Sequence, residues 1–191
     1  MRAMEPIREK KQVHKLLDYY RKQGHARNRV LIAMSVHSAL RISDTLQLKV
    51  EDVYDLKKKR VKLHIELTEG KTKKRKVVEL HPTVVAALKS YLPEAVNSKF
   101  LFPSTRKDSK SEHLSRVQAH RIIRAAGEAV GTEETISCHS LRKTFGYHAW
   151  KDGVSPAILM EIYNHSSLAI TRRYLGVAQS DMNEVYQRLS F

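Results

Sequence analysis

Four places in the sequence carry side chains that could bind a phosphate group or react with one. The first pairs His139 with Arg142 at a predicted helix start, where a spacing of three residues puts imidazole and guanidinium on one face. A helix N-terminus adds its own attraction for an anion. Together the two side chains can bind a phosphate and transfer a proton, which neither does alone. Two unrelated surface residues would give the same spacing, so this pair needs its context.

The second and third places lie before and after that pair. Arg41 follows an apolar predicted helix and lies three residues before a carboxylate, Asp44. Asp44 could orient the guanidinium of Arg41 towards a phosphate, although a purely structural ion pair explains the pattern as well. His165 is followed by Tyr174, nine residues later, across a short predicted helix. Most tyrosines pack by the ring and hydrogen-bond by the hydroxyl, so this pair is not decisive alone.

The fourth place is the densest basic run of the chain, residues 57–76, which hold ten Lys or Arg and only two Glu. Lys71, Lys73, Lys74 and Arg75 lie at or beside a predicted turn, where long flexible cations can reach into a DNA groove. A solvated charged surface is the alternative for most of them.

The composition favours a polyanionic partner. The 191 residues include 35 Lys or Arg and 20 Asp or Glu, which gives a formal net charge of +15 and a pI near 10.0. Each phosphate that Lys or Arg neutralises releases a condensed counterion, so such a surface favours nucleic acid. A basic surface that serves only solubility is the alternative.

Other classes of protein find little support in the sequence. No apolar run approaches the roughly 18 residues that a membrane-spanning helix needs, and no signal-peptide stretch opens the chain. The single cysteine, Cys138, excludes an intramolecular disulfide and suits a reducing compartment, so we expect a cytoplasmic protein. His139, His148 and His165 form no recognisable metal-ligand spacing, so we expect no metal and no other cofactor.

Hydrophobic periodicity predicts a mainly α chain with a small antiparallel β-sheet, an α+β class. Alternating residues predict a half-buried strand at 61–67 and a second strand at 77–80, joined by a polar turn at 69–73. Residues 104–113 are polar and predict an exposed loop. The helices are predicted before Gly24, at 26–39, after Pro82, between Ser115 and Gly131, and at 139–151, 155–163, 167–174 and 179–189.

The order and spacing of the four places resemble the active-site motifs of the tyrosine recombinase, or phage integrase, family. The resemblance covers residues 7 to about 176, includes all six active-site positions of that family in order, and implies its catalytic-domain fold. The matching segments, in chain order, are Leu40-Arg41-Ile42-Ser43-Asp44, Lys71-Thr72-Lys73-Lys74, His139-Ser140-Leu141-Arg142, Asn164-His165 and Tyr174.

By position, the resemblance implies that Arg41 and Arg142 bind the phosphate and that His165 donates a hydrogen bond to it. Two arginines can hold the non-bridging oxygens with paired, charge-assisted bonds and stay protonated throughout. One departure is Asn164, where many relatives carry glycine before the histidine. We expect this departure to be tolerated.

The resemblance also implies the groups that move protons. Tyr174 corresponds to the nucleophile, and a phenol with a pKa near 10 needs a nearby base or a strong positive field at neutral pH. His139 corresponds to the histidine that assists this proton transfer. Lys71 corresponds to the hairpin lysine that acts as general acid, a role that Lys73 or Lys74 could fill instead.

The implied activity is site-specific DNA recombination or integration, in which strands are cleaved and rejoined through a 3′-phosphotyrosine without metal or ATP. The implied partners are double-stranded DNA and further copies of the chain, as a tetramer on DNA. Two alternatives are a type IB topoisomerase-like relaxing activity and a non-catalytic DNA-binding protein that keeps the fold. The target DNA sequence is not readable from the chain.

The resemblance also implies a domain organisation. Residues 1–176 would form one catalytic domain, and residues 177–191 an amphipathic tail helix that relatives lend to a neighbouring protomer. The tail helix could instead fold back on its own core. Because Arg41 comes so early, we expect no N-terminal core-binding domain.

Overall fold

The computed structural model describes residues 4–104, 111–132, 135–177 and 179–188, and most of these residues are helical. Of the predicted loop 104–113, residues 105–110 lie outside the described ranges, as do residues 178 and 189–191 of the predicted tail. In the described ranges, no helix is both long and apolar enough to cross a membrane. The helices are α1 (Lys10–Lys22), α2 (Ala26–His37), α3 (Ile42–Leu46), α4 (Val50–Val53), α5 (Pro82–Ala95), α6 (Arg116–Val130), α7 (Cys138–Lys151), α8 (Pro156–Tyr163), α9 (Leu168–Leu175) and α10 (Gln179–Arg188).

Two antiparallel strand pairs accompany the helices, which confirms the predicted class of a mainly α chain with a small antiparallel sheet. β1 (Tyr54–Asp55) pairs with β2 (Arg60–Val61), and β3 (His64–Thr68) pairs with β4 (Arg75–Glu79). The predicted strand at 61–67 is therefore two strands, and Leu63 between them is 63% exposed rather than half-buried. The chain changes partner from β1 to β4 at this point, so the alternation of faces starts again there.

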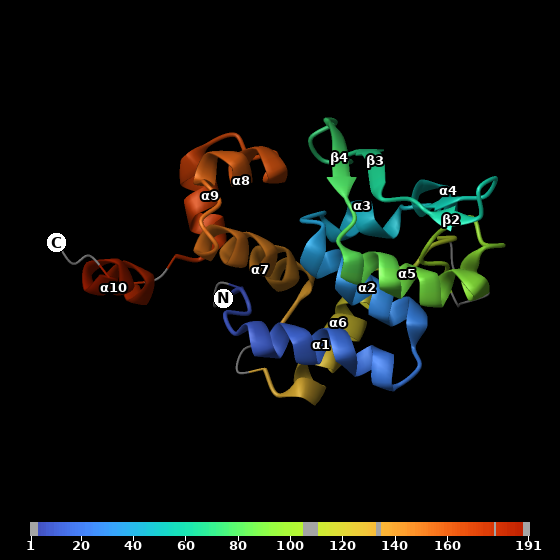
Figure 1. Ribbon diagram of the computed structural model, residues 1–191, viewed down its shortest axis with the longest axis horizontal. Coiled ribbons are helices and arrows are strands. Elements are labelled where there is room, and N and C mark those ends of the chain that lie inside the picture. The colour runs from blue at the N-terminus through green and yellow to red at the C-terminus, as the bar shows by residue number, and fades with distance from the viewer. Residues whose placement is uncertain (1–3, 105–110, 133–134, 178, 189–191) are drawn as a thin grey trace.

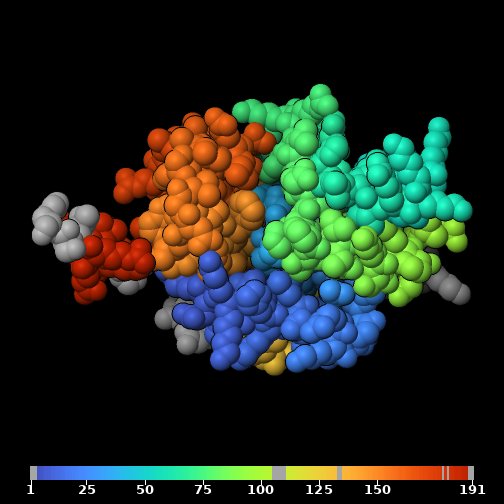
Figure 2. Space-filling model, viewed as in Figure 1, coloured from blue at the N-terminus to red at the C-terminus, as the bar shows by residue number. Residues whose placement is uncertain are grey.

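Helix α2 occupies the centre of the fold (Figure 1), because every side chain from Val30 to Val36 is buried. It contacts α1, α5, α6 and α7. A run of apolar residues without a polar face is typical of a helix covered on all sides. In the space-filling view a blue segment is visible between the orange C-terminal helices and the green hairpin and α5 (Figure 2). The loop from α2 to α3 thus runs between two parts of the molecule.

The C-terminal helices α7, α8 and α9 pack closely around one glycine. A Cβ atom added at Gly146 would lie 2.2 Å from the hydroxyl of Tyr163 and 2.9 Å from Leu175. Tyr163 is fully buried, and its hydroxyl donates a 2.8 Å hydrogen bond to the carbonyl of Arg142. Glycine at position 146 therefore lets α8 and α9 approach α7 at van der Waals distance.

Serine caps and left-handed residues set the ends of these short helices. Ser137 caps α7, where its hydroxyl accepts from the backbone N–H groups of His139 and Ser140 at 3.2 Å. Helix α8 ends at Tyr163 because the next residue, Asn164, has a φ of +53°, the left-handed conformation that asparagine tolerates better than most residues. This turn carries the chain straight into His165.

Helix α10 stands apart from the remaining helices (Figure 1). Asp181 anchors it, since this carboxylate is 5% exposed and pairs with Arg8 at 3.3 Å. The apolar side chains Met182, Val185 and Tyr186 are 44%, 54% and 79% exposed. The helix is thus held by its polar face, and its apolar face is uncovered in the single chain.

Candidate active site

One cavity of about 840 Å³ is lined by residues from several distant segments of the chain. The walls come from the α2–α3 loop, the β3–β4 turn, the start of α7, the α8–α9 corner and α9. All six residues that the sequence predicts as catalytic line this cavity: Arg41, Lys71, His139, Arg142, His165 and Tyr174. The fold thus brings together side chains that lie up to 133 positions apart in the sequence (174 − 41).

Tyr174 lies within reach of a base. Its hydroxyl oxygen is 3.4 Å from Nδ1 of His139, and the two rings meet edge to face at 4.9 Å. Burial raises the pKa of the Tyr174 hydroxyl, and the positive charges of Arg142 and Arg41 offset this only in part. Burial, with the charges of Lys143 and Arg142, lowers the pKa of His139. At neutral pH the phenol is therefore protonated and the imidazole is free to accept a proton.

Arg142 is a buried cation without a carboxylate partner among the described residues. Its side chain is 4% exposed; Nη1 donates to the carbonyl of Ala39, and Nη2 donates to that of Tyr163 at 3.2 Å. The guanidinium also lies over the Tyr163 ring, 4.8 Å from its centroid. Burial lowers the pKa of Arg142, but a guanidinium remains charged at any physiological pH. An uncompensated buried cation that lines a cavity is suited to hold an anion there.

Arg41 has a different carboxylate partner from the one predicted. Its Nη1 forms a 2.7 Å ion pair with Glu69 in the β3–β4 turn, and Glu69 is fully buried. The expectation that Asp44 orients Arg41 is not met: Oδ1 of Asp44 accepts a 3.1 Å hydrogen bond from the backbone N–H of Gly70. Asp44 is still close to the site, because this hydrogen bond holds the residue next to Lys71.

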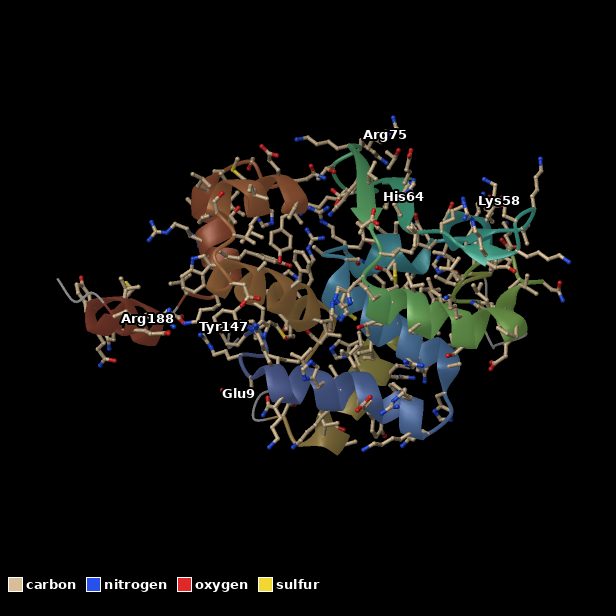
Figure 3. All side chains as sticks on the ribbon, viewed as in Figure 1. Glu9, Lys58, His64, Arg75, Tyr147 and Arg188 are labelled. Atoms are coloured by element: carbon tan, nitrogen blue, oxygen red, sulfur yellow. The ribbon has the colours of Figure 1, made fainter. Side chains whose placement is uncertain are left out.

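The hairpin lysines differ in their positions. Lys71 lines the cavity, whereas Lys73, Lys74 and Arg75 are exposed and are not among the lining residues. Arg75 pairs with Glu66 on the neighbouring strand and projects from the outer edge of the hairpin (Figure 3). Of the three lysines that could act as general acid, Lys71 is the one at the cavity, and the other basic residues lie where they could contact a longer DNA segment.

His165 stacks on the ring of Tyr163, with centroids 5.1 Å apart and planes 19° apart. Its Nδ1 lies 3.1 Å from the hydroxyl of Thr171, which is fully buried. Burial, with the charges of Arg142 and Arg41, lowers the pKa of His165 to about 4, so the ring is neutral at pH 7. The Thr171 hydroxyl has two acceptors within reach, Nδ1 of His165 and the carbonyl of Ser167 at 3.3 Å. When it donates to Nδ1, the ring proton lies on Nε2, the nitrogen that can donate to a phosphate.

Several residues of this site were missed in the sequence. The backbone carbonyl of Tyr163 accepts from both Arg41 and Arg142, at 3.4 and 3.2 Å. Arg116 and His120, at the start of α6, also line the cavity. Their i, i+4 spacing puts both side chains on one helix face and could have indicated them, but this spacing is common in helices.

A buried lysine adds to the positive potential. Lys76 on β4 donates to the carbonyl of Ile162 at 2.6 Å and lies 3.8 Å from Glu69. Burial lowers its pKa to about 8, and the charges of Arg142 and Arg41 act in the same direction against the opposing effect of Glu69. Arg41, Arg142 and Lys76 thus face two buried carboxylates, Asp44 and Glu69, so this part of the cavity carries excess positive charge.

Comparison with known proteins agrees with this arrangement. The phage integrase family profile matches residues 8–181. The chain is 36% identical over 187 residues to the probable integrase/recombinase YoeC of Bacillus subtilis, covering 98% of this chain and 97% of that protein. It is 28% identical to the tyrosine recombinase XerC of Thermodesulfovibrio yellowstonii, covering 85% of this chain and 54% of that protein.

Solved structures of other recombinases have the same fold. The XerA recombinase matches with a TM-score of 0.79 at 22% identity, over 99% of this chain and 68% of that one. A XerH site-specific recombinase bound to a palindromic difH substrate matches with a TM-score of 0.73 at 22% identity, over 97% of this chain and 53% of that one. The fold is that of a tyrosine recombinase catalytic domain. The chain belongs to the phage integrase family, and it spans nearly all of one curated relative and about half of the other.

Proposed function

We propose that the protein is a site-specific recombinase that cleaves and rejoins DNA through a covalent bond between Tyr174 and a 3′-phosphate. The proposal rests above all on the single cavity that holds a tyrosine hydroxyl, two arginines, two histidines and a lysine. Membership of the phage integrase family supports it further.

The proposed reaction includes two proton transfers. The Tyr174 oxygen attacks the phosphorus atom while its proton passes to Nδ1 of His139, 3.4 Å away. The bond from phosphorus to the 5′ oxygen breaks, and Lys71 gives a proton to the departing oxygen. Attack by a 5′-hydroxyl of another strand reverses these steps. The bond energy stays in the phosphotyrosine, so the cycle consumes no ATP.

The two arginines and His165 stabilise the transition state. Negative charge gathers on the non-bridging oxygens during attack, and donors already aimed at the cavity stabilise that charge without reorganising. Arg142 is held by two carbonyls and Arg41 by Glu69 before any substrate binds. The protein thus presents a preorganised positive site to a scissile phosphate.

The test is covalent capture of DNA. The protein is incubated with sheared genomic DNA of its source organism in EDTA and without ATP, then denatured, and protein attached to DNA is quantified. Wild-type protein is expected to form adducts, and Tyr174→Phe to form none while it binds DNA with the same salt dependence. Tyr19→Phe, on α1 and not among the residues that line the cavity, is the matched control and is expected to form adducts.

Two outcomes would refute the proposal. Adducts that persist in Tyr174→Phe would assign the nucleophile to another residue. Salt-sensitive DNA binding without any adduct from the wild type would make the protein a DNA-binding member of the family rather than an enzyme.

The proposed partners are double-stranded DNA and further copies of this chain on that DNA. The exposed basic edge at Lys73, Lys74 and Arg75 suits DNA phosphates, and we propose that the apolar face of α10 is exchanged between protomers. Substituting Met182 and Val185 by Lys is expected to leave the monomer folded and to abolish multimers on DNA in native gels. Multimers of unchanged stability would contradict the exchange.

A further inference from the structure

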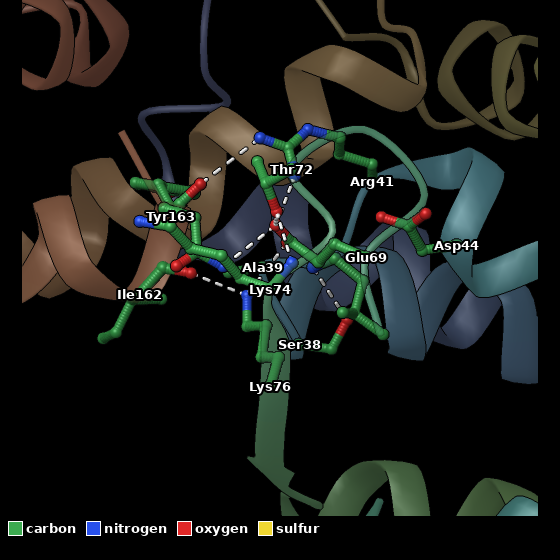
Figure 4. Close-up of polar contacts among 12 residues, drawn as sticks. Ser38, Ala39, Arg41, Asp44, Glu69, Thr72, Lys74, Lys76, Ile162 and Tyr163 are labelled. Atoms are coloured by element: carbon green, nitrogen blue, oxygen red, sulfur yellow. Dashed lines mark hydrogen bonds and ion pairs between the residues drawn. The ribbon is translucent and has the colours of Figure 1, made fainter. Parts of the chain in front are cut away.

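Glu69 is a buried carboxylate beside the cavity, and no role was predicted for it. It directly follows β3, in the same β3–β4 turn that carries Lys71, and it is completely buried. Figure 4 shows it at the centre of the contacts that join this turn to the rest of the site. A buried carboxylate is costly unless it is paired and hydrogen-bonded, so its contacts are the reason that it is tolerated.

Those contacts reach three separate elements of the site. Oε2 of Glu69 lies 2.7 Å from Nη1 of Arg41 and accepts a 2.7 Å hydrogen bond from the hydroxyl of Thr72, next to Lys71. The same oxygen accepts a 2.9 Å hydrogen bond from Nδ2 of Asn164, the residue directly before His165. One oxygen atom therefore connects the β3–β4 turn, the start of α3 and the α8–α9 corner.

The state of the carboxylate fits this role. Burial alone would raise the pKa of Glu69, but hydrogen bonds from Thr72, Asn164 and Arg41 outweigh burial and hold the pKa below its usual value. The group is charged at every pH at which the protein would work. All of its contacts to Oε2 therefore persist without a proton being gained or lost.

Two properties of Asn164 allow it to bind Glu69 from the α8–α9 corner. Its φ of +53° is the left-handed conformation, which glycine and asparagine adopt most readily. Glycine would meet the backbone requirement but has no side chain to reach Glu69. Asparagine at this corner, where the family motif commonly has glycine, supplies the amide donor.

We propose that Glu69 is a positioning residue of the cleavage reaction, which together with Asn164 locks the Lys71 turn, Arg41 and His165 into one arrangement around the Tyr174 hydroxyl. This inference rests on the proposed function. Glu69 touches no reacting atom; it acts through the three cavity residues to which its contacts lead. A misplacement of about 1 Å in such groups can cost on the order of 100-fold in rate.

The experiment measures single-turnover cleavage of a suicide DNA substrate at saturating protein, alongside the Kd for the same DNA. The DNA sequence is the one recovered from the covalent adducts of the wild type. Glu69→Gln is expected to lower the cleavage rate about 100-fold while Kd changes less than about twofold. Glu79→Gln removes the same charge from an exposed position on β4 and is the matched control, expected to cleave like the wild type.

Variants of Asn164 separate positioning from folding. Asn164→Gly keeps the backbone conformation and loses the amide donor, so cleavage is expected to fall about tenfold. Asn164→Asp keeps the size and the left-handed tendency but sets a second carboxylate against Glu69, and a larger loss is expected. The double variant Glu69→Gln with Asn164→Asp removes one of the two opposed carboxylates and leaves one to face Arg41, so it is expected to cleave faster than Asn164→Asp alone.

The rescue is the decisive readout, because a residue that only stabilises the fold would not restore activity when a second change is added. The idea is overturned if Glu69→Gln cleaves like Glu79→Gln, or if the double variant is no faster than Asn164→Asp alone. Failure of the proposed function would look different, since the wild type itself would then form no adduct.

Discussion

Arg142 offers a direct test of whether the empty cavity is built for an anion. The side chain is 4% exposed and bonds to the carbonyls of Ala39 and Tyr163 rather than to a carboxylate. Burying an ion costs several kcal/mol. Its two hydrogen bonds, from a charged donor, each contribute about 1.5–3 kcal/mol of stabilisation, and the contact with the Tyr163 ring contributes about 0.5–2 kcal/mol. These opposing contributions nearly cancel, so Arg142 adds little stability without an anion.

The perturbation is Arg142→Met, which removes the charge and keeps most of the length. Its Tm in a buffer without oxyanions is expected to equal or exceed that of the wild type. Phosphate at ten times its Kd should stabilise the wild type by about 1.4 kcal/mol, because it binds the folded state alone. For a domain of this size that corresponds to a Tm rise of about 3–6 °C, which Arg142→Met should lack.

The assay is thermal unfolding followed by circular dichroism over a phosphate series. Arg21→Met changes an exposed arginine on α1 that pairs with Asp18, and it corrects for general salt effects. An equal phosphate-dependent rise in Arg142→Met and the wild type would refute the reasoning. A large loss of stability in Arg142→Met without phosphate would do so as well, since it would make Arg142 a structural cation.

Three further predictions concern the surroundings of the site. Thr171→Val removes the hydroxyl 3.1 Å from Nδ1 of His165, and cleavage should fall about tenfold at unchanged Kd for DNA; an unchanged rate would show that Thr171 does not set the tautomer. Gly146→Ala drives a methyl group into Tyr163, and urea unfolding should register a loss of about 1–3 kcal/mol; equal or greater stability would show that α7 and α8 adjust freely. Burial lowers the pKa of His37 to about 4, so the unfolded state binds the proton first. The contribution of His37 to stability should be full above about pH 6.5 and fall towards pH 4, by about 2 kcal/mol at pH 5, so the protein should lose that much less stability in His37→Gln; equal falls would exclude His37 as a cause.

Local patterns predicted most of the site. His139 and Arg142 share a helix face whatever the rest of the fold does, and the predicted helices at 139–151 and 155–163 agree with α7 and α8 within a residue or two. The helical positions followed from hydrophobic periodicity in the same way. Features that depend only on ten or fifteen neighbouring residues could therefore be predicted from the sequence.

Contacts across the fold could not be predicted. Asp44 looked like the partner of Arg41 because it lies three residues away, yet in the short helix α3 its carboxylate faces the backbone of Gly70. The real partner, Glu69, comes from the hairpin, and its bond to Asn164 joins residues 95 positions apart. Such pairings depend on how α3, the hairpin and α8 meet, which periodicity does not specify.

Along the chain, the site residues that would hold a phosphate come before the tyrosine that would cut a strand. Arg41, Glu69 and Arg142 all come before α9, and the proposed nucleophile Tyr174 lies next to its last residue. A chain broken off before α9, by incomplete synthesis or by a protease, would keep both arginines without the group that we propose makes the covalent bond. Under the proposed function, such a fragment could not cut DNA. The position of one tyrosine at the end of α9 links that outcome to the order of translation itself.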